Sequence, residues 1–190
     1  TFTSTLLADN IVKGKMKVDD PISKYLPASV KVPTYKGGGP PITLGHLSDH
    51  TSSMLRMPTN MPESDPTDPA ADYTPELMYA FLSSYELPRE VGSEYEYSNF
   101  AVGVLGQIQA LAAGTSYEEA LTSVITSPLK MKETAITLSP KMKENLAVGH
   151  SMGMPVNNWD LNAMQGAGGI RSSAHDMLLY LSANLGLTKS

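Results

Sequence analysis

The order of apolar and polar residues predicts helices in several parts of the chain. Between residues 2 and 11, two pairs of apolar side chains lie four positions apart, which places them on one side of a helix. A longer apolar stretch, residues 98–113, begins with the polar letters Ser-Asn. Gly14 and Gly114 follow the two stretches, and glycine is a common residue just after the end of a helix. We therefore expect one helix over each stretch.

Capping signals predict further helices. Ser and Thr are favoured before a first helical turn, Pro is favoured at its first position, and an acidic residue three places after the cap completes a capping box. Ser98 or Asn99 would cap the long apolar helix. The other expected helix starts are Thr43, Thr74 before Pro75, Ser116 with Glu119, and Ser173 with Asp176.

Strand signals are few. Residues 144–159, with short alternating runs around a central glycine, predict a weak hairpin, and the proline-rich stretch 57–71 predicts an irregular connection. The glycine-rich stretch 165–173 predicts a packing turn, because it lacks both known phosphate-binding patterns. The chain should therefore be mainly α, with two or three short strands.

Composition excludes several kinds of function. The net charge is −5 and no long basic run is present, so the chain has no positively charged region to bind the phosphates of a nucleic acid. No apolar run reaches the ~20 residues that span a bilayer. The chain has no cysteine, so a thiol nucleophile and thiolate metal sites are excluded. His46 and His50 lie four apart but lack the glutamate of a zincin motif. We expect no metal, no cofactor, no nucleic acid and no membrane span.

Three candidate chemistries remain. Ser127 and Lys130 match the letters S-x-x-K, but a proline lies between them at a helix end, so we interpret the match as chance. The adjacent carboxylates Asp19-Asp20 and Glu118-Glu119 diverge on a helix and should be solvated. Tyr97 could act as a base only as phenolate, and lowering a tyrosine pKa from about 10 toward 7 takes roughly 4 kcal/mol. From the residues alone, packing at a helix start is favoured for Tyr97, and a catalytic role stays open.

Five segments together resemble class C β-lactamases and their relatives, the serine DD-peptidases and β-lactamase-like esterases. They occur in the family's order and approximate spacing, and the resemblance covers nearly the whole chain. The segments are residues 1–27, 42–54, 97–99 (YSN), 128–140 and 166–186. The resemblance implies an α+β fold for the parent enzyme, and for this chain the mainly α helical subdomain with a few short strands.

The resemblance also assigns roles to two residues. Tyr97 and Asn99 match the family's Y-x-N element residue by residue. It implies that Tyr97 is catalytic and relays the proton of a serine nucleophile, and that Asn99 binds the substrate's side-chain amide. The family usually has glycine where this chain has Ser53, and many members vary around Arg171.

Two family motifs are missing. The nucleophilic S-x-x-K would sit immediately before Thr1, and neither K-T-G nor H-T-G occurs anywhere. We therefore expect residues 1–190 to be a single partial domain of a parent that continues at both ends. Such a fragment should be inactive alone, and its exposed apolar surface could associate with another fragment or copy.

The resemblance implies a serine acyl-transfer hydrolase that acts on β-lactams through a covalent acyl-enzyme. A DD-peptidase or small-ester esterase of the same fold is the first alternative. A non-catalytic binding or assembly module is the second. By resemblance only, the enzyme would be periplasmic or secreted, and its partner would be a small-molecule substrate.

Overall fold

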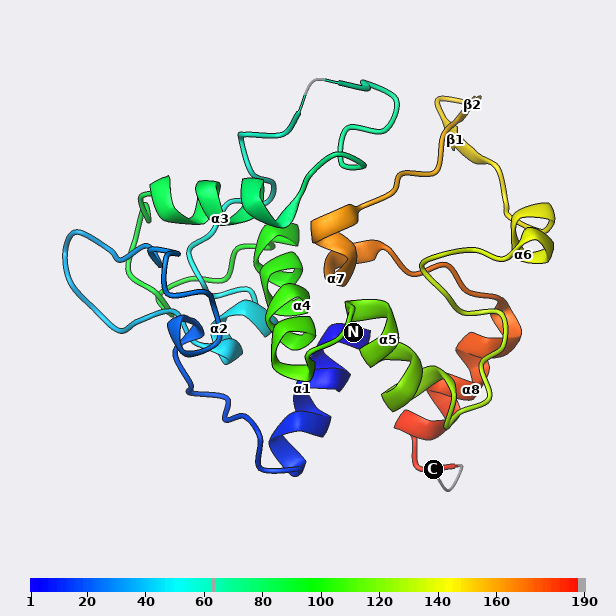
Figure 1. Ribbon diagram of the computed structural model, residues 1–190, viewed down its shortest axis with the longest axis horizontal. Coiled ribbons are helices and arrows are strands. Elements are labelled where there is room, and N and C mark those ends of the chain that lie inside the picture. Colours follow the sequence, from blue (N-terminus) through cyan, green and yellow to red (C-terminus); the bar gives the residue numbers. More distant parts are fainter. Residues whose placement is uncertain (63, 188–190) are drawn as a thin grey trace.

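The computed structural model describes residues 1–62 and 64–187, and in it the chain is arranged around one central helix, α4 (Figure 1). Short 3-10 or π turns, η1 to η3, connect the main elements. The helices are α1 (Phe2–Val12), α2 (Leu44–Ser48), α3 (Pro75–Ser84), α4 (Asn99–Ala113), α5 (Tyr117–Leu121), α6 (Pro140–Glu144), α7 (Gln165–Gly168) and α8 (Ala174–Asn184); the turns are η1 (Ile22–Lys24), η2 (Thr122–Thr126) and η3 (Asn162–Met164).

One two-stranded antiparallel sheet is present in the described residues. Strands β1 (Gly149–Ser151) and β2 (Met154–Val156) form the hairpin predicted from the sequence, with residue 149 opposite 156 and residue 151 opposite 154. It projects at one edge of the molecule, away from α4 (Figure 1). The prediction of a mainly α chain is confirmed.

Helix α4 is the most enclosed element. Nine of its fifteen residues are buried, because it contacts α1, α2, α5, α7 and η3. Ser98 caps its start, and Gly114 ends it in the left-handed conformation with φ 65°, which glycine adopts at low cost. The predicted boundaries of this helix are confirmed.

A close backbone approach joins α4 to α7. A Cβ added to Gly106 would lie 2.8 Å from the Cα of Gly166, and the reverse substitution would meet Gly106 at the same distance. The two helices can therefore touch only because both positions lack side chains. The glycine-rich stretch predicted as a turn is thus a helical turn where it contacts α4.

Two apolar clusters share helix α1. Leu7 belongs to a large cluster that includes Phe100 and Leu105 of α4, and Leu6 belongs to a second cluster that includes Tyr117 of α5. The rings of Phe2 and Tyr180 stack at a centroid distance of 4.1 Å, which attaches α8 to the second cluster. Helix α1 therefore connects the two halves of the molecule.

Two sequence predictions about acidic residues are wrong. Ser173 caps α8, but the buried carboxylate of Asp176 does not bond back to it; it accepts from the backbone N–H of Glu133 at 2.7 Å and the hydroxyl of Thr134 at 2.8 Å. Glu118 likewise accepts from the backbone of residues 136 and 137 instead of being solvated. Both carboxylates hold the segment 133–137, which local spacing could not show.

Asp20 also departs from the expected solvated state. Its carboxylate accepts from the hydroxyl of Tyr25 at 2.5 Å, from Lys24 at 2.9 Å and from the backbone N–H of Lys17. These bonds favour the charged form and lower the pKa of Asp20 to about 2. The carboxylate therefore ties the loop after α1 to the turn η1.

No helix among the described residues is both long enough and apolar enough to span a bilayer.

Candidate active site

The start of α4 is fixed by a buried serine. Ser98 is fully buried, and its Oγ accepts from the backbone N–H of Ala101 at 2.9 Å and donates to the carbonyl of Leu55 at 2.6 Å. Ser98, and not Asn99, is therefore the helix cap. One hydroxyl both begins the helix and joins it to the segment at residues 50–57.

That segment, residues 50–57, lies alongside residues 96–100. The backbone N–H of Glu96 donates to the carbonyl of His50 at 2.8 Å, and that of Phe100 donates to the carbonyl of Arg56 at 3.1 Å. Between them, the backbone N–H of Ser98 donates to Nδ1 of His50 at 3.2 Å. The backbone is thus held on both sides of the position occupied by Tyr97.

The Tyr97 side chain lies at the molecular surface, beside residues 50–57. Its ring is 43% exposed and lies against the ring of His50, with a centroid distance of 4.5 Å and planes tilted by 35°. The guanidinium carbon of Arg56 lies 5.3 Å from the Tyr97 ring centroid. No hydrogen bond to the Tyr97 hydroxyl is present among the described residues. This hydroxyl is therefore presented on a fixed backbone with its bonding capacity unused.

Asn99 faces the same segment. Its Nδ2 donates to the sulfur of Met57 at 3.5 Å, a weak interaction that leaves its carbonyl oxygen and second N–H for other partners. Tyr97 and Asn99 therefore both contact residues 50–57, as the Y-x-N spacing across a helix start permits.

His50 and Arg56 are site residues that sequence reasoning missed. The four-residue spacing suggests His50 only as a metal partner of His46, but the Nδ1 of His46 accepts from the backbone N–H of Thr43 at the cap of α2. His50 lies beyond the end of α2 and has a φ of 65°. Burial lowers the pKa of His50 and favours its neutral ring, in which Nδ1 can accept from Ser98. The described residues contain no group of three side chains arranged to hold a metal ion.

Ser53 shows how the chain accommodates a departure from the family pattern. Its φ is 61°, in the left-handed region that favours glycine. Its buried Oγ donates to the carbonyl of Arg89 at 3.0 Å and accepts from the N–H of the same residue at 3.3 Å. Arg89 in turn pairs with Glu96, next to Tyr97. The serine hydroxyl thus supplies bonds that a glycine could not.

The S-x-x-K match at Ser127 and Lys130 does not form a catalytic pair. Ser127 and Lys130 are both exposed in the turn that follows η2, and Lys130 has φ 59°.

The arrangement at Tyr97 can present a hydroxyl and an amide to a bound substrate. Neither a serine nor a lysine side chain bonds to Tyr97 in the described part of the chain.

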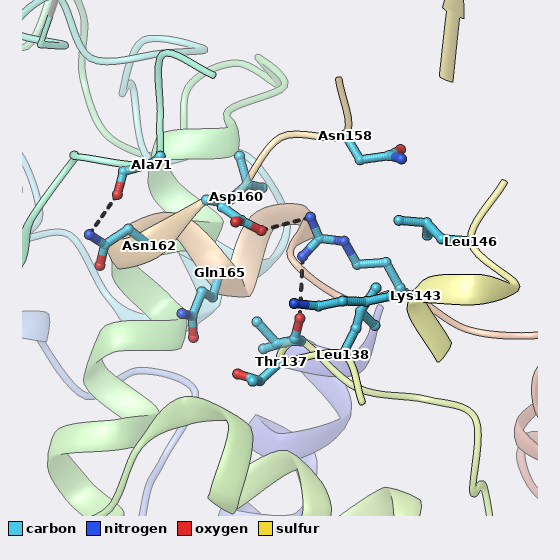
Figure 2. Close-up of a pocket in the computed structure, with 12 residues that line it drawn as sticks. Ala71, Thr137, Leu138, Lys143, Leu146, Asn158, Asp160, Asn162 and Gln165 are labelled. Atoms are coloured by element: carbon cyan, nitrogen blue, oxygen red, sulfur yellow. Dashed lines mark hydrogen bonds and ion pairs between the residues drawn. The ribbon is translucent and has the colours of Figure 1, made fainter. Parts of the chain in front are cut away.

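A cavity of about 610 Å³, lined by both polar and apolar side chains, lies in another part of the molecule (Figure 2). Figure 2 shows Lys143 reaching into this space, which neither Tyr97 nor Asn99 lines. One wall is held by the guanidinium of Arg171, which donates to Asp160 at 2.8 Å and to the carbonyl of Trp159 at 2.7 Å. The lining residues are Ala71, Ile136, Thr137, Leu138, Lys143, Leu146, Asn158, Asp160, Leu161, Asn162, Gln165 and Arg171.

The comparisons with known proteins agree over the whole chain. The profile of the family described as Beta-lactamase matches residues 1–190. The D-alanyl-D-alanine-carboxypeptidase/endopeptidase AmpH of Escherichia coli K12 is 36% identical over 185 residues, which cover 97% of this chain and 46% of that protein. A beta-lactamase of the same strain is 29% identical over 185 residues, covering 97% of this chain and 45% of that protein.

Solved structures give the same picture of the fold. A beta-lactamase/D-alanine carboxypeptidase from Yersinia pestis has a TM-score of 0.83 and 31% identity, over 95% of this chain and 50% of its own. A class C beta lactamase from Rhodobacter sphaeroides has a TM-score of 0.79 and 28% identity, over 100% of this chain and 50% of its own. The chain thus spans about half the length of these relatives, and the fold predicted from the resemblance is confirmed.

Proposed function

Because this chain belongs to the beta-lactamase family, we propose that it forms part of a serine acyl-transfer hydrolase that acts on β-lactams through a covalent acyl-enzyme. The observation that carries the proposal is the start of α4. There a fully buried Ser98 fixes the backbone, while the ring of Tyr97 and the amide of Asn99 contact a shared segment, residues 50–57. Preorganised groups of this kind are what acyl transfer requires.

In this proposal Tyr97 is the catalytic residue and Asn99 the substrate-binding residue of the chain. The nucleophilic hydroxyl attacks the substrate carbonyl, and Tyr97, as the phenolate or within a network that includes the lysine of S-x-x-K, accepts its proton. The same proton then passes to the leaving nitrogen or oxygen, which restores the starting state of Tyr97. Asn99 orients the acyl side chain by accepting from, or donating to, its amide. The serine and lysine of S-x-x-K would lie outside these 190 residues.

We also propose that residues 1–190 are one partial domain, the helical subdomain of the larger fold. Two observations support the proposal. The chain aligns with about half of each relative's length, and the described residues contain a sheet of only two strands. The chain by itself would then be inactive, and the rest of the fold would supply the nucleophile. Action on cell-wall-type substrates would place the enzyme in the periplasm or outside the cell.

A DD-peptidase is the second candidate. The 36% identity to AmpH, against 29% to a beta-lactamase of the same strain, favours a D-alanyl-D-alanine peptide as substrate. Both reactions pass through an acyl-enzyme, so the roles of Tyr97 and Asn99 are the same in either case.

The test is Tyr97→Phe in the full-length polypeptide that contains this chain. We expect hydrolysis of a chromogenic cephalosporin, or of a D-alanyl-D-alanine peptide, to fall by at least about 100-fold, because the proton relay is lost. Tyr95→Phe is the matched control, since this exposed tyrosine lies two residues away and its ring meets the same His50 ring edge-on, at a centroid distance of 5.7 Å. Equal activity of Tyr97→Phe and Tyr95→Phe would refute the catalytic assignment.

A further inference from the structure

Arg56 and Met57 are consecutive residues that contact the two proposed site residues. The guanidinium of Arg56 lies over the ring of Tyr97, and the sulfur of Met57 accepts from Asn99. The carbonyl of Arg56 also accepts from the backbone N–H of Phe100 at 3.1 Å, so its backbone is fixed relative to α4. Arg56 is therefore placed at the edge of the site by the same bonds that place Tyr97.

The charge of Arg56 is uncompensated in the part of the chain that the structure describes. Its side chain is exposed, and it takes part in none of the ion pairs found among those residues. Neighbouring carboxylates have other partners: Asp49 accepts bonds within its own turn, and Glu94 and Glu96 pair with Arg89. Arg56 thus presents a positive charge beside the Tyr97 ring.

The guanidinium carbon of Arg56 lies 5.3 Å from the Tyr97 ring centroid and the side chain is exposed, so its N–H groups are accessible to a ligand. A guanidinium can bind a carboxylate with two parallel bonds. The aromatic ring also limits the directions that the arginine can take, which reduces the entropy lost on binding an anion.

We propose that Arg56 is a specificity-determining residue that binds a carboxylate on the acyl side chain of the substrate. This inference rests on the proposed acyl-transfer function and adds a substrate class to it. The acyl side chain is the part of the substrate assigned to Asn99, and Arg56 lies one residue from Met57, the residue that Asn99 contacts. Substrates with an anionic acyl group are therefore preferred over neutral ones of the same scaffold.

The experiment compares substrates that differ by one carboxylate. Benzylpenicillin and its α-carboxy derivative form one pair, and the N-acetyl and N-succinyl forms of a D-alanyl-D-alanine dipeptide form the other. In the full-length polypeptide, kcat/KM is measured for both members of the pair that is turned over. Arg56→Gln should lower the anionic-to-neutral ratio of kcat/KM about fivefold, the size expected for a partly solvated ion pair.

Two further variants make the result specific. Arg56→Lys keeps the charge but cannot make two parallel bonds, so it should retain only part of the ratio and lie between wild type and Arg56→Gln. Lys132→Gln removes an exposed charge elsewhere and should not change the ratio. An arginine that merely packs on Tyr97 would affect both substrates equally, so an unchanged ratio in Arg56→Gln overturns the proposal. Failure of the wild-type enzyme to hydrolyse either pair would instead refute the proposed function on which it rests.

Salt dependence tests the same point without a substitution. The anionic-to-neutral ratio of the wild-type enzyme should fall as sodium chloride rises from 0.05 M to 0.5 M, because screening weakens an exposed ion pair. A ratio that does not depend on salt overturns the proposal even if the Arg56 variants fail to fold.

Discussion

Helices α4 and α8 begin in the same way but differ in how much of each helix is buried. Each follows a serine whose hydroxyl accepts from a backbone N–H three residues later. Helix α4 buries nine of its fifteen residues, while α8 buries two of eleven, Asp176 and Tyr180. Yet α8 also carries apolar side chains, and Leu178 and Leu181 are 62% and 51% exposed among the described residues. Apolar content thus favours burial but does not decide it.

The difference has a consequence for the site. Helix α4 is held along its length by contacts with five other elements, so Tyr97, which directly precedes its N-cap Ser98, is attached to a rigid base. Helix α8 is attached chiefly on one side, through Tyr180 and the buried carboxylate of Asp176. A catalytic group requires the first kind of support, because small displacements cost large factors in rate.

The largest expected difference between the helices comes from the same substitution made in each. Leu105→Ala in α4 should lower the free energy of unfolding by about 3 kcal/mol, since it removes a fully buried side chain and leaves a cavity. Leu178→Ala in α8 should change it by less than about 0.5 kcal/mol. Urea unfolding of the full-length polypeptide measures both values. A loss of several kcal/mol for Leu178→Ala would mean that another part of the polypeptide covers α8.

The contact between α4 and α7 should be nearly as sensitive. Gly106→Val places a branched side chain against the backbone of Gly166, which neither helix can accommodate without moving, and about 2 kcal/mol should be lost. Ala112→Val adds similar bulk to an exposed position of the same helix and serves as the control. Equal melting temperatures for the two variants would show that α7 can move away from α4 at no cost.

The two serine caps should differ although their local geometry is alike. Ser98→Ala removes the cap and the bond to the carbonyl of Leu55, and should cost about 2 kcal/mol. Ser173→Ala removes only a cap bond, of 3.3 Å, and should cost about 1 kcal/mol. Thermal unfolding of the two variants checks the order, and equal losses would show that the bond to Leu55 contributes nothing.

Acid should act on the start of α4 through His50, with the smallest effect of the four. Burial lowers the pKa of His50 below its ordinary value of 6.5, so the unfolded chain binds a proton more readily than the folded one. The stability that neutral His50 contributes is complete above pH 6.5 and is lost as the pH falls below that value.

Nuclear magnetic resonance measures this titration directly. The His50 ring protons should titrate with a midpoint below 6.5, and the stability difference between wild type and His50→Gln should shrink as the pH falls. His175→Gln removes a solvent-exposed histidine of α8 and is the control. A His50 midpoint above 6.5 would contradict the burial argument.

Local signals predicted much of the fold because they depend on neighbours in the chain. The caps at Thr43, Thr74 and Ser116, the stop at Gly114 and the hairpin after residue 144 all follow from interactions within a few residues. The capping box expected at Ser173 is absent because a long-range interaction took the place of the local one. The carboxylate of Asp176 found partners 42 and 43 residues away in the chain, and these partners exclude the local bond.

The candidate site also has one part that the sequence predicted and another part that only the structure revealed. The letters Y-x-N marked Tyr97 and Asn99 from the sequence, and their roles remain a proposal. His50 and Arg56 lie more than 40 residues earlier, and they reach Tyr97 only because the backbone of residues 50–57 bonds to that of residues 96–100. The pattern of apolar and polar residues within either segment gives no information about this pairing of the two segments.

The sequence by itself determined where the longer helices begin, the mainly α character of the chain, and the position of the Y-x-N element. Only the tertiary structure decided which apolar face is enclosed, which carboxylates are buried, and which side chains surround Tyr97. The physical reason is range: caps and periodicity act over one or two turns, whereas burial depends on every element that packs against a surface. For this protein, that is why α4 and α8 look alike as sequences and differ as structures.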